Sequence, residues 1–198
     1  MVVCVTTLRN AMHSRSVLLV IPLLGVMLGC EKNPAEPQQE NPQELITTVL
    51  VHVWDEPDSM HTHTFAFRDL DGPGGNPPAI DTVHFHGHAQ SWRLRLDFLN
   101  ESKEPTDTIT AEIRREAETH QVFYELSAEL QPYVSIERLD FDRNGLPLGL
   151  EARVRLQTHE ELHGSLRIRL FHYDAVPKSA QPGGETDVDV TFPVHIMP

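Results

Sequence analysis

The sequence predicts an all-β protein, a two-sheet antiparallel β-sandwich of the immunoglobulin-like kind with one short helix. Three observations support this fold class. From Leu45 onward, apolar and polar residues alternate in short segments, which is typical of strands that bury one face. Glycine, proline, asparagine and aspartate separate the segments, and these residues favour turns. One segment instead repeats its apolar residues every four positions, as a helix does.

Nine segments have the strand pattern, and their shortness suits a sandwich. In chain order they are residues 45–54, 61–68, 82–89, 92–98, 121–126, 133–139, 149–157, 165–173 and 186–196. We expect their aromatic side chains to pack in the core or in cross-strand pairs; these are Trp92, Phe98, Phe123 and Tyr124. We expect their arginines to face solvent and pair with carboxylates; these are Arg93, Arg95, Arg153, Arg155, Arg167 and Arg169.

The helix is predicted between Asp107 and His120. Ile109, Ile113 and Ala117 recur every four residues, and Asp107 stands before them as an N-cap. The spacing predicts a short amphipathic helix that buries its isoleucines.

The N-terminus has the form of a lipoprotein signal peptide, with a start at Met1 or Met12. Val17–Leu28 is apolar, Arg15 precedes it, and Gly29-Cys30 follows. An uncleaved anchor helix is the alternative, but about 20 apolar residues are needed to span a bilayer. The sequence therefore predicts a signal peptide over 1–29, lipidation of Cys30, a flexible tether over 30–44 and one domain over 45–198. The expected location is the cell envelope, at either face of the outer membrane.

Charge and cysteine content exclude several functions. The chain has a net charge of −13, and all 29 acidic residues follow position 30. Such a charge argues against nucleic acid as a partner and favours the attraction of cations. Residues 31–198 contain no cysteine, which excludes thiolate metal sites and structural disulfides in the domain.

Several short blocks resemble small Bacteroidetes-type envelope lipoproteins, a group labelled "type 1 periplasmic binding fold superfamily". The blocks are Leu45–Thr48, Phe67–Gly72, Leu99–Ser102, Glu118–Gln121, Asn144–Leu150 and Gly183–Asp187. The label denotes a two-lobed α/β fold, which the strand pattern contradicts. The resemblance implies metal handling beside an outer-membrane TonB-dependent receptor. Members often carry histidines just after the lipidated cysteine, whereas Glu31–Glu44 has none here.

The histidines of this chain lie inside the strand segments instead. His84, His86 and His88 alternate on one strand, so their side chains share a face at a spacing of about 7 Å. His61 and His63 do the same on a nearby strand, and His52 lies on the strand before. Imidazoles from two neighbouring strands could bind zinc or another divalent transition metal. A solvated polar face is the alternative.

Two further motifs have metal-ligand spacing. His159-Glu160-Glu161-Leu162-His163 matches the zinc-protease pattern HExxH, which requires a helix; the flanking strands predict a hairpin turn, so we expect no enzyme. Asp140, Asp142, Asn144 and Glu151 match a calcium-loop pattern. Asn144-Gly145 is equally a strong hairpin signal.

The sequence therefore predicts a non-enzymatic, lipid-anchored sandwich that binds a divalent transition metal, zinc above others, and assists a TonB-dependent importer. Such binding would weaken around pH 6 as imidazoles protonate. The alternative is a metal-independent module that binds a protein or a glycan at the envelope.

Overall fold

The computed structural model describes residues 45–198 except Pro57, Pro73, residues 87–89 and Ala175, and it gives no side-chain detail for 58–60. The expected signal peptide, tether and lipidated Cys30 lie outside the described residues, as does His88. Within the described part, no helix has the length and apolar character that crossing a bilayer requires.

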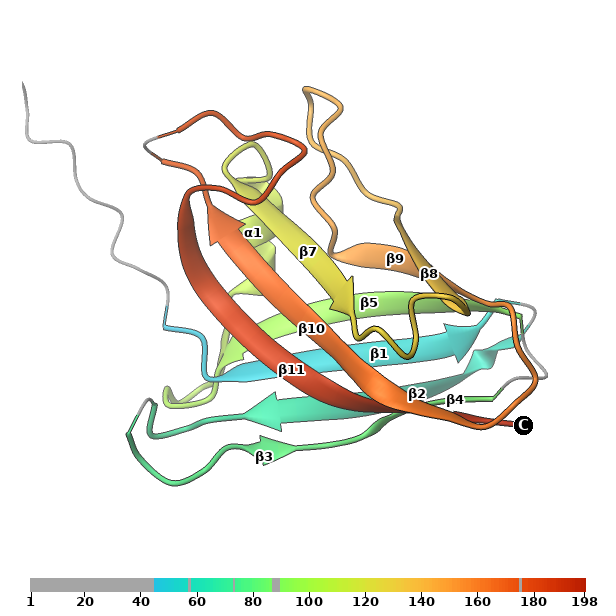
Figure 1. Ribbon diagram of the computed structural model, residues 1–198. Helices are drawn as coiled ribbons and strands as arrows, with labels where there is room; N and C mark the ends of the chain where they lie inside the picture. Colours follow the sequence, from blue (N-terminus) through green and yellow to red (C-terminus); the bar gives the residue numbers. More distant parts are fainter. Residues whose placement is uncertain (1–44, 57, 73, 87–89, 175) are drawn as a thin grey trace, which may run out of the picture. The chain divides into compact units, whose positions relative to one another are not determined.

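Two β-sheets form the domain, and the predicted all-β sandwich is confirmed (Figure 1). The first sheet has seven strands in the order β3-β2-β1-β5-β9-β8, with β6 also paired to β5. Its strands are β1 (Thr48–Asp55), β2 (Asp58–Arg68), β3 (Ala79–Ile80), β5 (Ser91–Asn100), β6 (Asp107–Thr108), β8 (Val134–Arg138) and β9 (Glu151–Leu156). All pairs in this sheet are antiparallel.

The second sheet has four strands in the order β4-β11-β10-β7 and runs obliquely across the first in Figure 1. Its strands are β4 (Val83–His86), β7 (His120–Leu126), β10 (Leu162–His172) and β11 (Glu185–Met197). The pairs β7–β10 and β10–β11 are antiparallel, but β4 and β11 are parallel. The alternating pattern predicted antiparallel pairs only, and this prediction is wrong for β4 and β11. No hairpin turn, which would impose antiparallel pairing, joins β4 to β11, because the two strands are far apart in the sequence.

The core lies between the two sheets and follows the alternation in the sequence. From the first sheet, Leu94, Leu96 and Phe98 are fully buried. From the second sheet, Ile168 and Phe192 meet them in the same cluster of buried residues. Each buried side chain of this size contributes about 1.5–3 kcal/mol to folding, so the alternation fixes which face of each strand points outward.

Helix α1 (Thr110–Arg115) is shorter than predicted, and the expected cap at Asp107 is wrong. The N-cap residue is Ile109, with no side-chain cap, and Asp107 lies in β6. Ile109 and Ile113 are buried as expected. The chain then turns after Glu116, and β7 begins at His120 and pairs with β10.

The six strand arginines pair with carboxylates, as predicted. Arg93 and Arg153 share Glu56, Arg167 pairs with Asp189, and Arg169 pairs with Glu125. Arg95 and Arg155 pair with Asp97 and Glu137. These ion pairs neutralise some of the carboxylates on the two sheets.

Candidate metal centre

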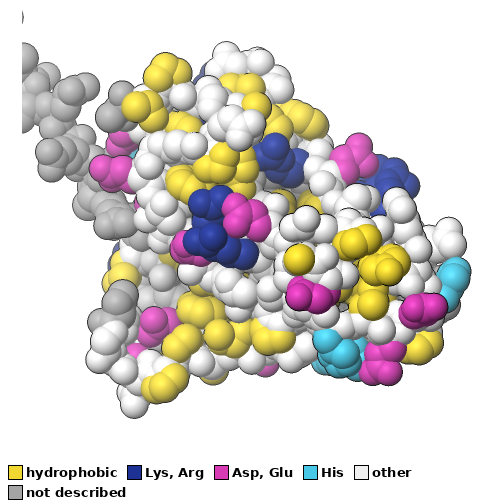
Figure 2. Space-filling model, in the orientation of Figure 1, with side chains coloured by type: hydrophobic (Ala, Val, Ile, Leu, Met, Phe, Trp, Pro, Cys, Tyr) yellow, Lys and Arg dark blue, Asp and Glu magenta, His cyan; other side chains and the backbone are white. Residues whose placement is uncertain are grey.

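Three histidines lie side by side on the outer face of the second sheet. His163 on β10 is directly opposite His195 on β11, and His195 is directly opposite His84 on β4. The order of strands thus places residues that are far apart in the sequence in one row. Figure 2 shows histidine and acidic side chains next to one another at the lower right of this face.

The outward direction of these histidines follows from their neighbours. Val194 and Ile196 flank His195 and are buried, so His195 points away from the core by strand alternation. Val83 and Phe85 flank His84 and are buried in the same way. The histidine row is therefore a consequence of the apolar pattern combined with the strand register.

The first two rings of the row are in direct contact. The His163 and His195 ring centroids are 4.2 Å apart, with their planes 15° from parallel. The His84 and His195 centroids are 5.6 Å apart in an edge-to-face arrangement. Phe65 contacts the other side of His84, at 5.8 Å between centroids.

Glu161 joins the two stacked rings from the segment just before β10. Its Oε1 lies 2.9 Å from Nε2 of His195 and 3.4 Å from Nε2 of His163. The hydrogen bond from His195 lowers the pKa of the Glu161 carboxyl, so this group is ionised at neutral pH. One carboxylate oxygen and one nitrogen from each imidazole lie within 4.8 Å of one another.

The donor set is suitable for a divalent transition metal. Neutral imidazole and carboxylate are ligands of zinc, with Zn–N and Zn–O distances of about 2.0–2.2 Å. Two ligand atoms of a tetrahedral zinc ion lie roughly 3.4 Å apart, close to the 2.9 and 3.4 Å between Glu161 Oε1 and the two Nε2 atoms, so a small movement of the side chains would give such distances. His163 is 70% exposed at its side chain and Glu161 58%, which leaves room for this movement.

His84 offers a third imidazole beside the pair. Its Nδ1 is buried and has no hydrogen-bond partner among the described residues. A buried ring nitrogen without a partner is costly, and a ligand or water could satisfy it. His84 is the member of the sequence-predicted set that the structure places in this row.

The other predicted histidines are not gathered with it. His61 and His63 are exposed on β2 and belong to neither of the two ligand groups found among the described residues. His86 contacts Trp92, with centroids 6.3 Å apart. His52 is held by Thr64 and Asp97, whose oxygens lie 2.8 and 3.0 Å from its ring nitrogens.

The sequence pattern did not single out His195, nor Glu161 as a candidate ligand. His195 is a single histidine in a strand of otherwise ordinary alternation, so only the register of β11 reveals it. Glu161 and His163 were visible within the HExxH pattern. The motif forms no helix: the chain bends at Glu160 and enters β10 at Leu162. The expected hairpin turn is also wrong, since β9 and β10 belong to different sheets.

The predicted calcium loop is occupied by its own hydrogen bonds. Asp140 accepts backbone N–H bonds from Gly149, Leu150 and Glu151, at 2.9–3.1 Å. Asp142 accepts two more through Oδ1, and its Oδ2 lies 3.0 Å from the Lys178 ammonium. Glu151 pairs with Arg93 and Arg114. These contacts employ the carboxylates that a calcium ion would need.

Comparisons of the chain with models of protein families, with curated proteins and with solved structures find no match. Function must therefore be inferred from the arrangement of the side chains.

Proposed function

We propose that this protein binds a divalent transition metal ion, zinc in the first place, at Glu161, His163 and His195. The observation that carries the proposal is the convergence of one ionised carboxylate and two imidazoles within 4.8 Å. Nitrogen and oxygen donors without sulfur suit zinc, copper and nickel. Imidazole remains the expected ligand type, but the proposed ligands are His163 and His195 instead of the predicted histidines, of which His84 lies beside the site.

The proposed site would bind metal reversibly and would not hold it as a permanent structural ion. Three protein ligands leave a fourth position open, and His84, water or a group on a partner protein could fill it. Exposed ligands allow exchange of the ion with a partner. This arrangement suits carriage and transfer of a metal, and the acidic surface would raise the local cation concentration.

The proposed setting is the cell envelope, with the domain anchored through a lipid on Cys30. In this setting the protein would pass metal to a TonB-dependent importer in the outer membrane. The support is the apolar segment that ends at Gly29-Cys30. Mass spectrometry of the native protein tests the anchor: a diacylglyceryl group on Cys30 is expected, and a free thiol with an intact leader would contradict it.

Calorimetric titration with zinc tests the metal site, using the full chain without a histidine tag. His195→Ala removes the central ring of the row and should weaken zinc binding at this site by at least about tenfold. His63→Ala is the matched control, because His63 is an exposed strand histidine outside the ligand group. If His195→Ala and His63→Ala bind zinc equally well, the site is wrong.

A metal-independent module for a protein or glycan is the competing function. Chelation distinguishes the two, since a partner interaction that serves metal transfer should depend on bound metal. Partner binding that persists unchanged after chelation would favour the competing function.

A further inference from the structure

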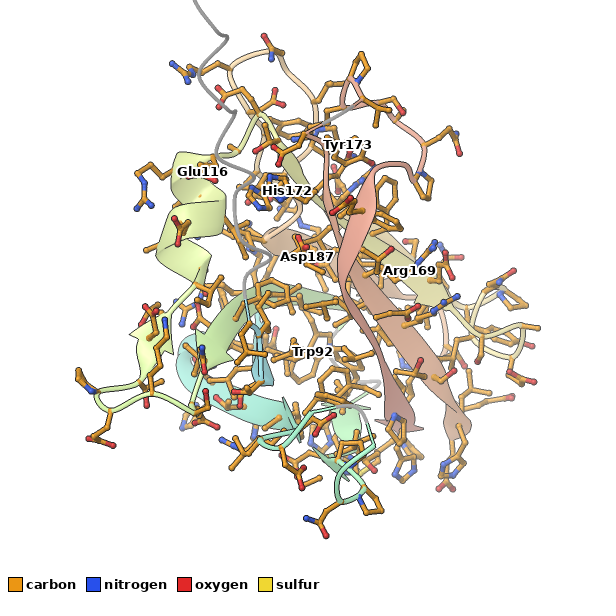
Figure 3. The ribbon with its side chains drawn as sticks, turned by 90° about the vertical axis from the view of Figure 1, so that its left-hand side faces the viewer. Trp92, Glu116, Arg169, His172, Tyr173 and Asp187 are labelled. Atoms are coloured by element: carbon orange, nitrogen blue, oxygen red, sulfur yellow. The ribbon has the colours of Figure 1, made fainter. Side chains whose placement is uncertain are left out.

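A second group of histidines lies at the opposite end of β10, on the inner face of the sheet. His120 begins β7 and is directly opposite His172, which ends β10. His120 is fully buried, at 0% exposure, where the sandwich meets the end of α1. Glu116, the C-cap residue of α1, lies next to this pair, as Figure 3 shows for Glu116 and His172.

Hydrogen bonds fix the protonation of the His120 ring. Its Nδ1 lies 3.0 Å from the backbone carbonyl oxygen of Glu116. A carbonyl oxygen only accepts, so Nδ1 carries the proton and donates it. The neutral ring therefore has its lone pair on Nε2. That atom is buried and has no hydrogen-bond partner among the described residues.

This arrangement is the one that a metal-ligating histidine usually has. Such a histidine donates one ring N–H to a carbonyl or carboxylate and binds the ion through the other nitrogen. Burial lowers the pKa of His120, which keeps the ring neutral at pH 7. Nε2 of His120 is thus a buried acceptor atom on a neutral ring whose orientation is fixed by the hydrogen bond at Nδ1.

His172 is oriented in a comparable way. Its ring is stacked on His120, with centroids 4.3 Å apart. Its Nε2 lies 3.0 Å from Oδ1 of Asp174. Ligand atoms of Glu116, His120 and His172 lie within 4.8 Å of one another. Two histidines, each with one ring nitrogen beside an oxygen acceptor, therefore converge with the Glu116 carboxylate.

Asp187 adds a further buried acceptor close to His172. It is the extra residue at a bulge in β11, since Leu170 pairs with Val188 but Phe171 pairs with Thr186. Its Oδ2 is buried and without a hydrogen-bond partner in the described part of the chain. Burial raises the pKa of Asp187 to about 6. Figure 3 shows Asp187 below His172.

The neighbouring cation does not satisfy these acceptors. Lys178 lies close enough to contribute to the lowered pKa of His120. Its ammonium is held instead by Asp142 at 3.0 Å and by the Ala117 carbonyl oxygen at 2.8 Å. Nε2 of His120 and Oδ2 of Asp187 are therefore buried hydrogen-bond acceptors that receive no hydrogen bond from a described residue.

We propose that Glu116, His120 and His172 hold a second divalent transition metal ion, buried between the sheets. The ligands are two imidazole nitrogens and a carboxylate oxygen, with Asp187 near enough to offset the charge of the ion. This site is independent of the exposed one: its residues differ, and it lies at the other end of β10. Because His120 is fully buried and the His172 side chain is only 11% exposed, the ion exchanges more slowly than at the exposed site and survives dialysis.

Zinc titration of the full chain, together with elemental analysis after dialysis, tests the buried site. Wild-type protein should bind zinc at this site in addition to any exposed site, and the dialysed protein should retain about one equivalent. His172→Asn and Glu116→Gln should each remove the retained equivalent or weaken it at least about tenfold. His195→Ala should leave the retained equivalent unchanged, which separates this site from the exposed one.

Folding of the variants is checked by circular dichroism and thermal denaturation. Glu116→Gln keeps the size of the side chain and removes only its charge, so it is the variant least able to disturb the fold. Folded Glu116→Gln and His172→Asn proteins that retain zinc exactly as wild type does would overturn the proposal. So would dialysed wild-type protein that retains no zinc after prior saturation.

Discussion

His163 and His195 face each other across the β10–β11 pair, with ring centroids 4.2 Å apart, and Glu161 Oε1 lies 2.9 Å from Nε2 of His195 and 3.4 Å from Nε2 of His163. Both rings turn their Nε2 atoms toward the Glu161 carboxylate, which can only accept a hydrogen bond, so a metal ion at this position would have to displace the Nε2 proton of His195. The pairing register alone creates this relationship, since 32 positions separate the two residues in the sequence. A change of one residue in the β11 register would turn His195 into the core.

Zinc should stabilise the folded protein through the exposed site. A ligand at 100 times its dissociation constant adds about 2.7 kcal/mol to the free energy of unfolding. For a domain of this size, the expected rise in Tm is roughly 5–10 °C. Differential scanning fluorimetry checks this, with magnesium as the control ion because it prefers oxygen ligands. An equal rise with magnesium would contradict a nitrogen-rich site.

The buried ion pair between Lys178 and Asp142 should be important for stability. Their side chains are 3% and 0% exposed, and the two atoms lie 3.0 Å apart. Lys178→Met leaves a buried carboxylate without its partner and should lower the free energy of unfolding by about 3–5 kcal/mol. Urea denaturation measures the change. Arg143→Met is a matched control, because Arg143 is 87% exposed in its pair with Glu118; it should cost less than about 1 kcal/mol.

The same pair predicts a loss of stability in acid. Burial raises the pKa of Asp142, but hydrogen bonds from the Leu146 backbone N–H and from Lys178 outweigh it, and the net pKa is lowered. A lowered carboxyl pKa contributes stability above the ordinary value of about 4, and this contribution is lost as pH falls below it. Asp142→Asn should therefore be less stable at pH 7 and lose less on acidification. Denaturation curves between pH 7 and pH 2.5 that run parallel for both proteins would contradict this.

Gly184 should be more sensitive to substitution than Gly72. Both have a positive φ, of 79° and 73°, so alanine at either position costs about 1–2 kcal/mol in backbone strain. An added Cβ at Gly184 would also collide with the carbonyl oxygen of His172, whereas at Gly72 it meets nothing within 4 Å. Gly184→Ala should therefore be the more destabilised variant in urea and the weaker in retaining zinc at the buried site. If Gly184→Ala and Gly72→Ala lose the same free energy of unfolding and retain the same amount of zinc, the backbone near His172 accommodates the added Cβ and this prediction is wrong.

His52 is expected to be structural. Its ring nitrogens bond Thr64 and Asp97 on the two flanking strands, so the side chain links β2, β1 and β5. His52→Ala should cost about 1–2 kcal/mol through the lost hydrogen bonds and leave zinc affinity unchanged. Titration calorimetry and urea denaturation of the same preparation check both parts. A fall in zinc affinity would add His52 to the metal ligands.

The sequence could predict the strands because each carries its own apolar alternation. The nine expected segments correspond to nine of the eleven strands in the described part of the chain, while the two-residue strands β3 and β6 are too short to have a pattern. Pairing could not be predicted, since alternation does not state which strands are neighbours. That is why the parallel β4–β11 pair was missed and why β9 and β10 were expected to form a hairpin.

For the candidate sites, too, local patterns could be predicted from the sequence but strand pairing could not. His84, Glu161 and His163 stood out through local patterns, whereas His195, His120 and His172 are single histidines without a motif. Their meeting depends on strand register and on the turn after Glu116, which are properties of the folded chain. The predicted group of His84 with His61 and His63 is not among the ligand groups of the described residues, and His84 pairs with His195 because β4 joins β11 in the second sheet.

The most direct test of the exposed metal site is diffraction from crystals of the zinc-loaded protein, recorded on both sides of the zinc absorption edge. We predict an anomalous peak between Glu161, His163 and His195, at about 2.0–2.2 Å from their ligand atoms. An absence of anomalous density at this position in zinc-saturated crystals would contradict the proposed function.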